Sequence, residues 1–314
     1  LLGIAIPYLI KKFRFLEKFT WAYGVVGVFA LAIVLILGAV TNGSKISYSL
    51  GGYTFQPSEF VKILFVFFVA GMYARSRDFL QVVITTAVAA VHVIVLVLSK
   101  DLGSALIFFV VYVAMTFVAT RNYFYLILGI IAGCGSGIVA AKIFSHVRVR
   151  ILAWQDPWSY IDGSGYQITQ SLFAIGTGGW FGMGLYQGEP TAIPYVSEDF
   201  IFSAVAEELG VFFSICLILV CLSSFIAFIY ASMRMKNEYY RLIAAGLAVT
   251  YIFQIFLTIG GGTRFIPLTG VTLPFISYGG SSVLSTLIMF CIVQGIYCIR
   301  AEEGGRDGRK ETEE

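Results

Sequence analysis

The chain has 314 residues and a net charge of +3, with 58% of its residues hydrophobic, only 12% charged and a mean hydropathy of +0.86. This composition excludes an ordinary soluble domain and predicts a membrane protein. The small positive charge comes mainly from basic residues in one set of connections, so it fits contact with membrane lipids and gives no support for nucleic-acid binding.

The first element in chain order is a short apolar run, LLGIAIPYLI, with no initiator Met or charged region before it. It predicts the end of a truncated helix and not a signal peptide. Eight longer apolar segments follow, each long enough or nearly so to cross the roughly 30 Å hydrocarbon core, for which a helix needs about 20 residues. We expect these helices near residues 22–41, 59–74, 79–98, 102–119, 123–143, 200–230, 241–261 and 282–299. The sequence therefore predicts an all-α polytopic membrane protein with eight full transmembrane helices and a partial N-terminal one.

Lys and Arg residues concentrate in alternate connections between these helices, as they do in cytoplasmic loops. The long loops, at about 42–58, 144–198 and 262–281, fall on the opposite side. We therefore expect the long loops outside and the C-terminus in the cytoplasm. Residues 1–300 then form a single transmembrane domain, and the polar, mixed-charge tail 301–314 is predicted to be disordered.

The longest loop, 144–198, is rich in aromatic residues and contains a helix-like apolar stretch, 168–175, between Gly-rich turns. Its Trp154, Trp158, Tyr160 and Trp180 suit an aromatic belt at the level of the lipid headgroups. They equally suit a shelf that binds saccharides, and the sequence leaves both interpretations open.

Four acids, Glu198, Asp199, Glu207 and Glu208, stand at the start of an apolar run that continues to Tyr230. The first two, with the preceding serine, would serve equally as helix caps. The last two lie about 12 Å deeper on roughly the same side of the helix. Ionisable groups at that depth face the bundle interior and pair with a cation.

Lys62 is the natural intramembrane cation for these acids, although Glu59, three residues earlier, can balance part of its charge locally. A structural buried set and a functional polar cavity are both compatible with this pattern.

Seven motifs occur in order: QPSEFVK, KDLGSA, WQDPW, GYQITQS, AIGTGGWFGMGL, SEDFIFSAVAEELG and TRFIPLTGVTLPFISYGGSS. With these motifs the chain resembles, over nearly its whole length, the shape, elongation, division and sporulation family of bacterial membrane proteins, typified by RodA, FtsW and SpoVE. The family has ten membrane helices, in agreement with a chain that lacks the first and part of the second.

The resemblance implies a peptidoglycan glycosyltransferase that polymerises lipid II at the outer face of the bacterial cytoplasmic membrane. The family normally works with a class B penicillin-binding protein, which crosslinks the strands. The reaction needs a general base near the acceptor hydroxyl and cations or hydrogen-bond donors near the pyrophosphate. Elongation, division and sporulation are not distinguished by the sequence.

Asp199 occupies the position of the family's essential aspartate, so the resemblance implies that it is the catalytic base. Arg264 and the following SYGGSS would hold the pyrophosphate, or else be an interfacial arginine and a tightly packed helix start. Asp156 would orient a cation or simply begin a turn with Pro157. The predicted substrate-binding residues are Arg264, Arg150, Lys62, Glu59, Trp154, Asp156, Gln167, Ser277, Tyr278 and Ser281.

A pyrophosphate leaving group would favour a divalent cation such as Mg²⁺, but no ligand cluster is visible in the sequence. The five cysteines lie in apolar segments without a CxxC pair, and the two histidines, His92 and His146, are far apart. No disulfide framework, zinc site or certain cofactor is indicated.

The chain departs from the family pattern in two places, which favour a divergent branch. Ser47 stands where Trp is expected in the first outer loop, and Ser99 and Lys100 replace the usual Gln-Pro. No role is therefore carried over to that loop. Two other classes of function remain as alternatives, a flippase for lipid-linked sugars and a non-catalytic scaffold of a cell-wall complex.

Overall fold

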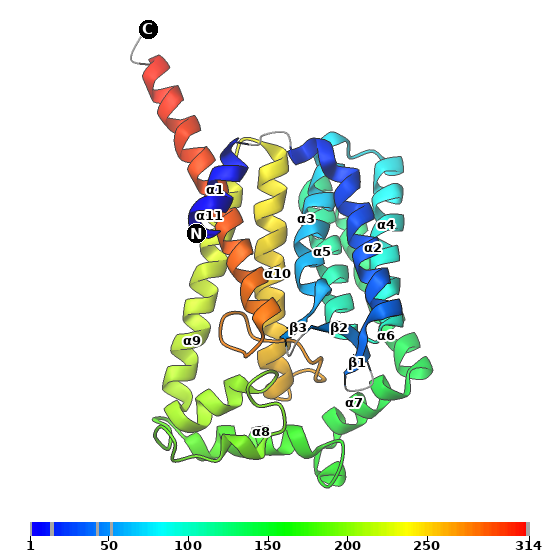
Figure 1. The fold of residues 1–314 in the computed structure, drawn as a ribbon, viewed down its shortest axis with the longest axis vertical. Helices are drawn as coiled ribbons and strands as arrows, with labels where there is room; N and C mark the ends of the chain where they lie inside the picture. Colours follow the sequence, from blue (N-terminus) through cyan, green and yellow to red (C-terminus); the bar gives the residue numbers. More distant parts are fainter. Residues whose placement is uncertain (1, 13–15, 42–43, 51–52, 312–314) are drawn as a thin grey trace. The chain divides into compact units, whose positions relative to one another are not determined.

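The computed structural model describes residues 2–12, 16–41, 44–50 and 53–311, which are mainly helical (Figure 1). Eight helices in this part of the chain are long and apolar enough to cross a membrane, which confirms the predicted polytopic fold. They are Leu16–Leu37, Pro57–Arg75, Phe79–Leu98, Leu102–Thr120, Tyr123–Ile143, Ile201–Met233, Glu238–Gly262 and Gly280–Arg300.

The chain divides into two compact units that alternate along the sequence. The first comprises Leu1–Leu126, Phe225–Tyr251 and Gly280–Glu314, and the second comprises Ile127–Ser224 and Ile252–Gly279. Helices α6 (Tyr123–Ile143), α9 (Ile201–Met233) and α10 (Glu238–Gly262) each contribute to both. The single domain expected for residues 1–300 stays a prediction.

Helix α3 (Pro57–Arg75) forms the core of the first unit. It packs against α2 (Thr20–Leu37), α4 (Phe79–Leu98), α5 (Leu102–Thr120) and α11 (Gly280–Glu311), and α1 (Leu2–Lys12) packs against α11. Most α3 side chains are buried, as expected for a helix that is apolar on all sides. Near its end, the Tyr73 hydroxyl lies 2.9 Å from that of Thr116 on α5. The buried contacts of α3 hold the polar residues at its N-terminal end in position.

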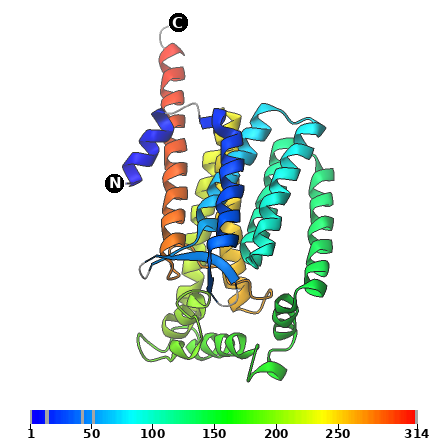
Figure 2. The same cartoon turned by 45° about the vertical axis from the view of Figure 1, so that its right-hand side comes forward.

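Three short strands join α2 to α3 (Figure 2). The second and third lie in the loop predicted at 42–58, whereas the first occupies the end of the helix predicted at 22–41, because α2 ends at Leu37. They are β1 (Ala39–Thr41), β2 (Ser44–Leu50) and β3 (Tyr53–Phe55), paired antiparallel in the order β1-β2-β3. Ser47, which replaces the expected Trp, is buried in β2 opposite Ala39. The sequence analysis did not predict these strands.

The second unit contains the long loop, which is mostly folded. It includes α7 (Ser145–Gln155), a short turn η2 (Trp158–Tyr160), α8 (Tyr166–Gly178) and a second turn η3 (Pro190–Ala192). Helix α8 confirms the helix expected over 168–175, whereas α7 was not predicted.

Helix α9 is broken at Gly210, whose φ of 82° and ψ of 174° are not helical. The backbone of 179–184 fills the break: Met183 and Gly184 donate to the carbonyls of Glu207 and Glu208, at 2.9 and 3.0 Å. Val211 and Phe212 donate to the carbonyls of residues 179 and 180. The polar groups that a helix break would expose are thus paired, as the interior of a membrane requires.

Helix α11 continues to Glu311, past residue 300, where the sequence analysis placed the start of a disordered tail. Ala, Glu, Lys and Arg, which have high helix propensity, make up much of this segment and outweigh its three glycines. Residues 312–314 lie outside the described part, and the cytoplasmic location of the tail stays a prediction.

Candidate active site

Asp199 lies in the second unit, two residues before the first residue of α9. Its backbone N–H donates to the carbonyl of Tyr195 at 3.0 Å, which places it in a tight turn. The carboxylate is largely buried and accepts no hydrogen bond from the described residues. The alternative in which it caps α9 therefore has no hydrogen bond to support it among these residues.

The pKa of Asp199 is raised from 3.8 to about 6, mainly because burial disfavours the charged form. The neighbouring Glu198 carboxylate also raises this pKa, and the Arg150 guanidinium opposes both effects. Burial is thus the largest influence on the pKa of this carboxyl.

Arg150, on α7, reaches the same place from another element. Its guanidinium donates to the carbonyls of Leu268 and Thr269, at 3.4 and 3.2 Å. A Cβ atom built on the next residue, Gly270, would lie 3.7 Å from Asp199 Oδ2 and 3.8 Å from a terminal nitrogen of Arg150. The acid and the cation therefore flank Gly270, whose φ of 73° favours glycine.

Ser277 and Tyr278 hold the loop that carries Asp199. The Ser277 hydroxyl donates to the carbonyl of Glu198 and accepts from the N–H of Leu273 at 2.7 Å. The Tyr278 N–H donates to the carbonyl of Ser197 at 2.7 Å, while its ring is 77% exposed. Ser277 thus has a positioning role in this structure, and only the Tyr278 ring is open to a ligand.

Arg264 and Trp154 form a reciprocal contact at the C-terminal end of α7. The Arg264 guanidinium donates to the carbonyls of Trp154 and Gln155, at 2.9 and 2.7 Å, and Trp154 Nε1 donates back to the carbonyl of Arg264 at 3.1 Å. A cation suits this helix end because the last carbonyls carry partial negative charge. Part of the Arg264 donor capacity is therefore used within the protein.

A groove of about 650 Å³ opens beside this contact, lined by Trp154, Gln155, Leu172, Thr263 and Arg264. A guanidinium has five N–H donors, and Arg264 uses only some of them on the two carbonyls. Arg150 and Trp154 lie one turn apart on α7, so they share a face of that helix. The groove is therefore close to the side of α7 that faces Asp199.

Asp156 and Gln167, two further predicted site residues, lie near this groove in sequence. Asp156 is exposed and accepts from the Ser159 N–H and hydroxyl, at 3.3 and 2.5 Å, and these bonds lower its pKa. This geometry supports the turn-forming interpretation of Asp156. Gln167 is half-buried on α8.

Glu207 and Glu208 contact the loop that precedes α9 and stay within the second unit. Glu207 Oε1 accepts from the N–H of Glu189 at 3.2 Å, and Glu208 Oε1 accepts from the N–H of Tyr186 at 3.1 Å. The structural interpretation of these acids is therefore supported. Their loop contacts were not predicted from the sequence.

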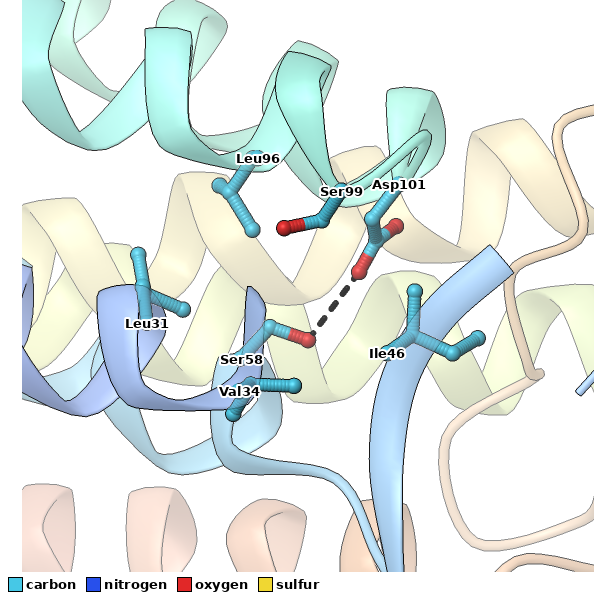
Figure 3. A pocket seen from close by; sticks show the side chains of 7 residues that line it. All are labelled: Leu31, Val34, Ile46, Ser58, Leu96, Ser99 and Asp101. Atoms are coloured by element: carbon cyan, nitrogen blue, oxygen red, sulfur yellow. Dashed lines mark hydrogen bonds between the residues drawn. The ribbon is translucent and has the colours of Figure 1, made fainter. Parts of the chain in front are cut away.

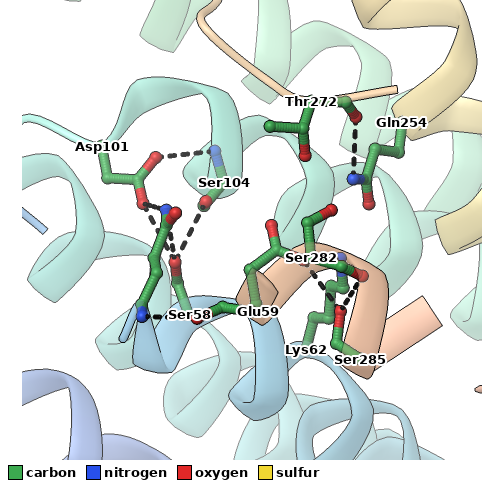
Figure 4. Close-up of polar contacts among 11 residues, drawn as sticks. Ser58, Glu59, Lys62, Asp101, Ser104, Gln254, Thr272, Ser282 and Ser285 are labelled. Carbon is green, nitrogen blue, oxygen red and sulfur yellow. Dashed lines mark hydrogen bonds and ion pairs between the residues drawn. The ribbon is translucent and has the colours of Figure 1, made fainter. Parts of the chain in front are cut away.

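In the first unit, Glu59 and Lys62 form a buried ion pair of 2.6 Å, to which Ser285 donates a hydrogen bond of 2.9 Å (Figure 4). This confirms that Lys62 is balanced locally by Glu59. Ser281 accepts from the N–H of Gln56 at 3.1 Å and donates to the carbonyl of Thr54 at 3.3 Å. These three predicted site residues are thus tied into the start of α3.

Asp101, which the sequence analysis did not single out as a site residue, is the centre of a second polar cluster at this end of α3. It caps α5 by accepting from the Ser104 N–H at 3.1 Å, and it also accepts from Ser58 at 3.2 Å and from Gln56 at 3.4 Å. Burial raises its pKa. The Asp-x-x-Ser spacing in KDLGSA is the capping signal that could have identified it.

Figure 3 shows Ser58 and Asp101, joined by their hydrogen bond, in the lining of a small cavity. Its volume of about 10 Å³ is close to that of a single water site. The lining residues are Leu31, Val34, Ile46, Ser58, Leu96, Ser99 and Asp101. The cavity is too small for a substrate, so this cluster is best explained as support for α3 and α5.

Within the part of the chain that the structure describes, no three His, Cys, Asp or Glu side chains come together as metal ligands.

The geometry describes a polytopic membrane protein whose loop residues converge on a largely buried aspartate. A family model for FtsW, RodA and SpoVE, described as "Cell cycle protein", matches residues 1–301. The chain belongs to this family.

Named relatives are similar over most of the chain. Peptidoglycan glycosyltransferase RodA of Mycobacterium tuberculosis (strain ATCC 25618 / H37Rv) is 36% identical over 309 residues, which cover 91% of this chain and 65% of the relative. The probable peptidoglycan glycosyltransferase FtsW of Pseudoalteromonas translucida is 33% identical over 282 residues, covering 86% and 70%. The chain thus spans just under two thirds of the length of its mycobacterial relative.

Two solved structures share the fold. One, described as "Structural coordination of polymerization and crosslinking by a peptidoglycan synthase complex", matches with a TM-score of 0.81 and 24% identity, covering 95% of this chain and 87% of that one. The rod shape determining protein RodA of Thermus thermophilus matches with a TM-score of 0.69 and 23% identity, covering 95% and 85%.

Proposed function

We propose that the protein is a peptidoglycan glycosyltransferase that polymerises lipid II into glycan strands. The observation that carries the proposal is Asp199, a largely buried carboxylate that accepts no hydrogen bond from the described residues, has a pKa of about 6 and lies with Arg150 beside Gly270. A general base works best when its pKa lies near the working pH. The names of the relatives support the same activity.

In the proposed reaction, Asp199 removes the proton from the 4-hydroxyl of the acceptor sugar. The hydroxyl oxygen forms a bond to the anomeric carbon of the donor, whose bond to the oxygen of undecaprenyl pyrophosphate breaks. The proton remains on Asp199, and the leaving group carries away the bonding electrons. Arg150 favours the ionised form of the base, and in this proposal its charge stabilises the departing pyrophosphate.

The groove at Trp154 and Arg264 is the proposed saccharide-binding surface. An indole face suits the apolar face of a sugar, and the remaining Arg264 donors suit its oxygens or a phosphate. Gln167 and the exposed Tyr278 ring are the further candidates for contact with substrate in this unit. Substrate contacts of five other residues stay predictions, since the hydrogen bonds and the ion pair described here for them lie within the protein: Asp156, Ser277, Ser281, Glu59 and Lys62.

We place the protein in the bacterial cytoplasmic membrane, with its long loops outside and its C-terminus in the cytoplasm. The distribution of Lys and Arg supports this orientation. The proposed partner is a class B penicillin-binding protein, consistent with the peptidoglycan synthase complex that shares the fold. Whether the complex serves elongation, division or sporulation is left to genetic tests.

The test is polymerisation of purified lipid II in detergent by the protein with its cognate partner. Wild type, Asp199→Asn and the control Asp162→Asn, which removes an exposed loop acid, are compared after gel filtration. We expect strands from wild type and from the control and none from Asp199→Asn. Strands from folded Asp199→Asn would refute the assignment of the base.

The same assay separates the alternatives, because detergent removes the sealed compartment that a flippase needs. Absence of strands from all three proteins would refute the glycosyltransferase proposal. Lipid II movement across sealed vesicles would then indicate transport, and its absence a scaffold.

A further inference from the structure

We propose that Glu207 is a positioning residue for Asp199, and this inference rests on the proposed function. The two acids are eight residues apart in sequence, Asp199 just before the first turn of α9 and Glu207 in its second turn. They are also joined by a second route, through the loop 186–199 that precedes the helix. Glu207 closes that route by fixing the loop to the helix.

The contact that closes it is buried. Glu207 is 7% exposed, and its Oε1 accepts from the backbone N–H of Glu189 at 3.2 Å. The backbone of Gly188 lies directly against the same carboxylate, since a Cβ built there would be 2.8 Å from Glu207 Cδ. A larger residue at position 188 would force either the loop or the Glu207 side chain to shift, so the loop lies in direct contact with the acid.

From Glu189 a series of short turns leads to Asp199. Ala192 donates to the carbonyl of Glu189 at 3.0 Å, and Val196 donates to that of Ile193 at 3.2 Å. The N–H of Asp199 then donates to Tyr195 at 3.0 Å. These successive hydrogen bonds restrain the backbone between residues 189 and 199, so this part of the loop has little freedom to move.

Ile193, in the middle of this series, is anchored as well. It is buried against Ala174 of α8 and Phe200, the residue after Asp199. The loop is therefore fixed by a polar contact at one end and an apolar contact in its middle. Displacing the loop at Glu189 would therefore also shift the turn that carries Asp199.

Stability alone does not explain an acid at position 207. Its second oxygen, Oε2, is buried and has no hydrogen-bond partner among the described residues. An unpaired buried polar atom costs free energy that an apolar side chain would not. The acid is better explained by the loop geometry that its first oxygen imposes.

The experiment compares Glu207→Gln and Glu207→Ala with wild type in lipid II polymerisation, with Asp162→Asn as the control. A misplacement near 1 Å costs about 100-fold in rate, so Glu207→Ala should lose about 10- to 100-fold in kcat with KM within about twofold. Glu207→Gln keeps the accepting oxygen and should retain most of the rate. Wild-type kcat in Glu207→Ala, or equal losses in both variants, would overturn the inference.

Hydrogen–deuterium exchange of the same proteins tests the contact without reference to activity. We expect faster exchange over 186–199 in Glu207→Ala, and wild-type exchange there in Glu207→Gln. Unchanged exchange in Glu207→Ala would overturn the proposal even if activity fell. If wild type makes no strands, the proposed function fails while exchange still decides the contact.

Gly188→Ala provides a second variant in case Glu207→Ala does not fold. The added methyl pushes the loop from the acid without removing any polar atom, so it should lower kcat and speed exchange over 186–199. Wild-type values of both would refute the inference.

Discussion

Replacing Asp199 with Asn should make the protein more stable while it abolishes the proposed activity. The carboxylate has a pKa of about 6 in the folded protein against an ordinary value of 3.8, because burial disfavours its charge. The folded state therefore binds this proton more tightly than the unfolded state. The resulting stability is fully present below pH 3.8 and is lost as the pH rises through about 6.

The size of the effect follows from the two pKa values. Their difference corresponds to at most about 3 kcal/mol at pH 7, and to about half of that at pH 5, where the folded carboxyl is mostly protonated. Asn resembles the protonated acid at every pH. Its stabilising effect should therefore be several degrees of melting temperature at pH 7 and shrink as the pH falls.

Thermal unfolding in detergent at pH 7 and pH 5 measures this difference. Asp156→Asn is a control for which the pKa shift has the opposite sign, because hydrogen bonds from Ser159 lower the pKa of that exposed carboxyl. It should not stabilise the protein at pH 7. An Asp199→Asn protein that melts at or below wild type at pH 7, or a difference independent of pH, would refute the assignment of burial as the dominant effect.

Three further predictions concern the surroundings of Asp199 and the break in α9. Arg150→Gln should move the acidic limb of the pH–rate profile to higher pH, because the charge of Arg150 lowers the pKa of Asp199; an unmoved limb contradicts this. Gly270→Ala places a methyl between these two side chains at a φ of 73°, and should lower kcat at least about tenfold in the strand assay. Gly210→Ala, at a φ of 82° and 2.4 Å from the inserted backbone, should cost more than about 1 kcal/mol in thermal unfolding, whereas Gly135→Ala, with open space, should not.

The membrane spans could be predicted closely because hydropathy and length are constraints that the bilayer imposes on each segment by itself. The segment expected at 102–119 is the helix Leu102–Thr120, and the one expected at 123–143 is Tyr123–Ile143. Helix α7 was not predicted because it is short and its sequence has only a weak amphipathic pattern. Its role depends on Arg150 and Trp154 contacting a loop more than a hundred residues later.

The sequence predicted which residues lie at the site better than it predicted the hydrogen bonds that these residues make. Ser277 and Arg264 were expected to hold substrate, yet their polar atoms bond to the backbones of distant loops. A sequence shows that a donor exists and does not show whether the protein already uses it. The same limit hid Asp101, whose lone pairs are taken by three neighbours.

The acids of the apolar run can now be explained by the broken helix that contains them. Inside a membrane, a loop that folds into a helix break must find acceptors for each of its N–H groups. The carbonyls freed at Gly210 satisfy part of the loop, and the Glu207 and Glu208 side chains satisfy the N–H groups of residues 189 and 186 further along. A leucine at either place would leave a loop N–H without that acceptor. The two carboxylates therefore follow from the break, and the break fixes the loop whose other end is Asp199.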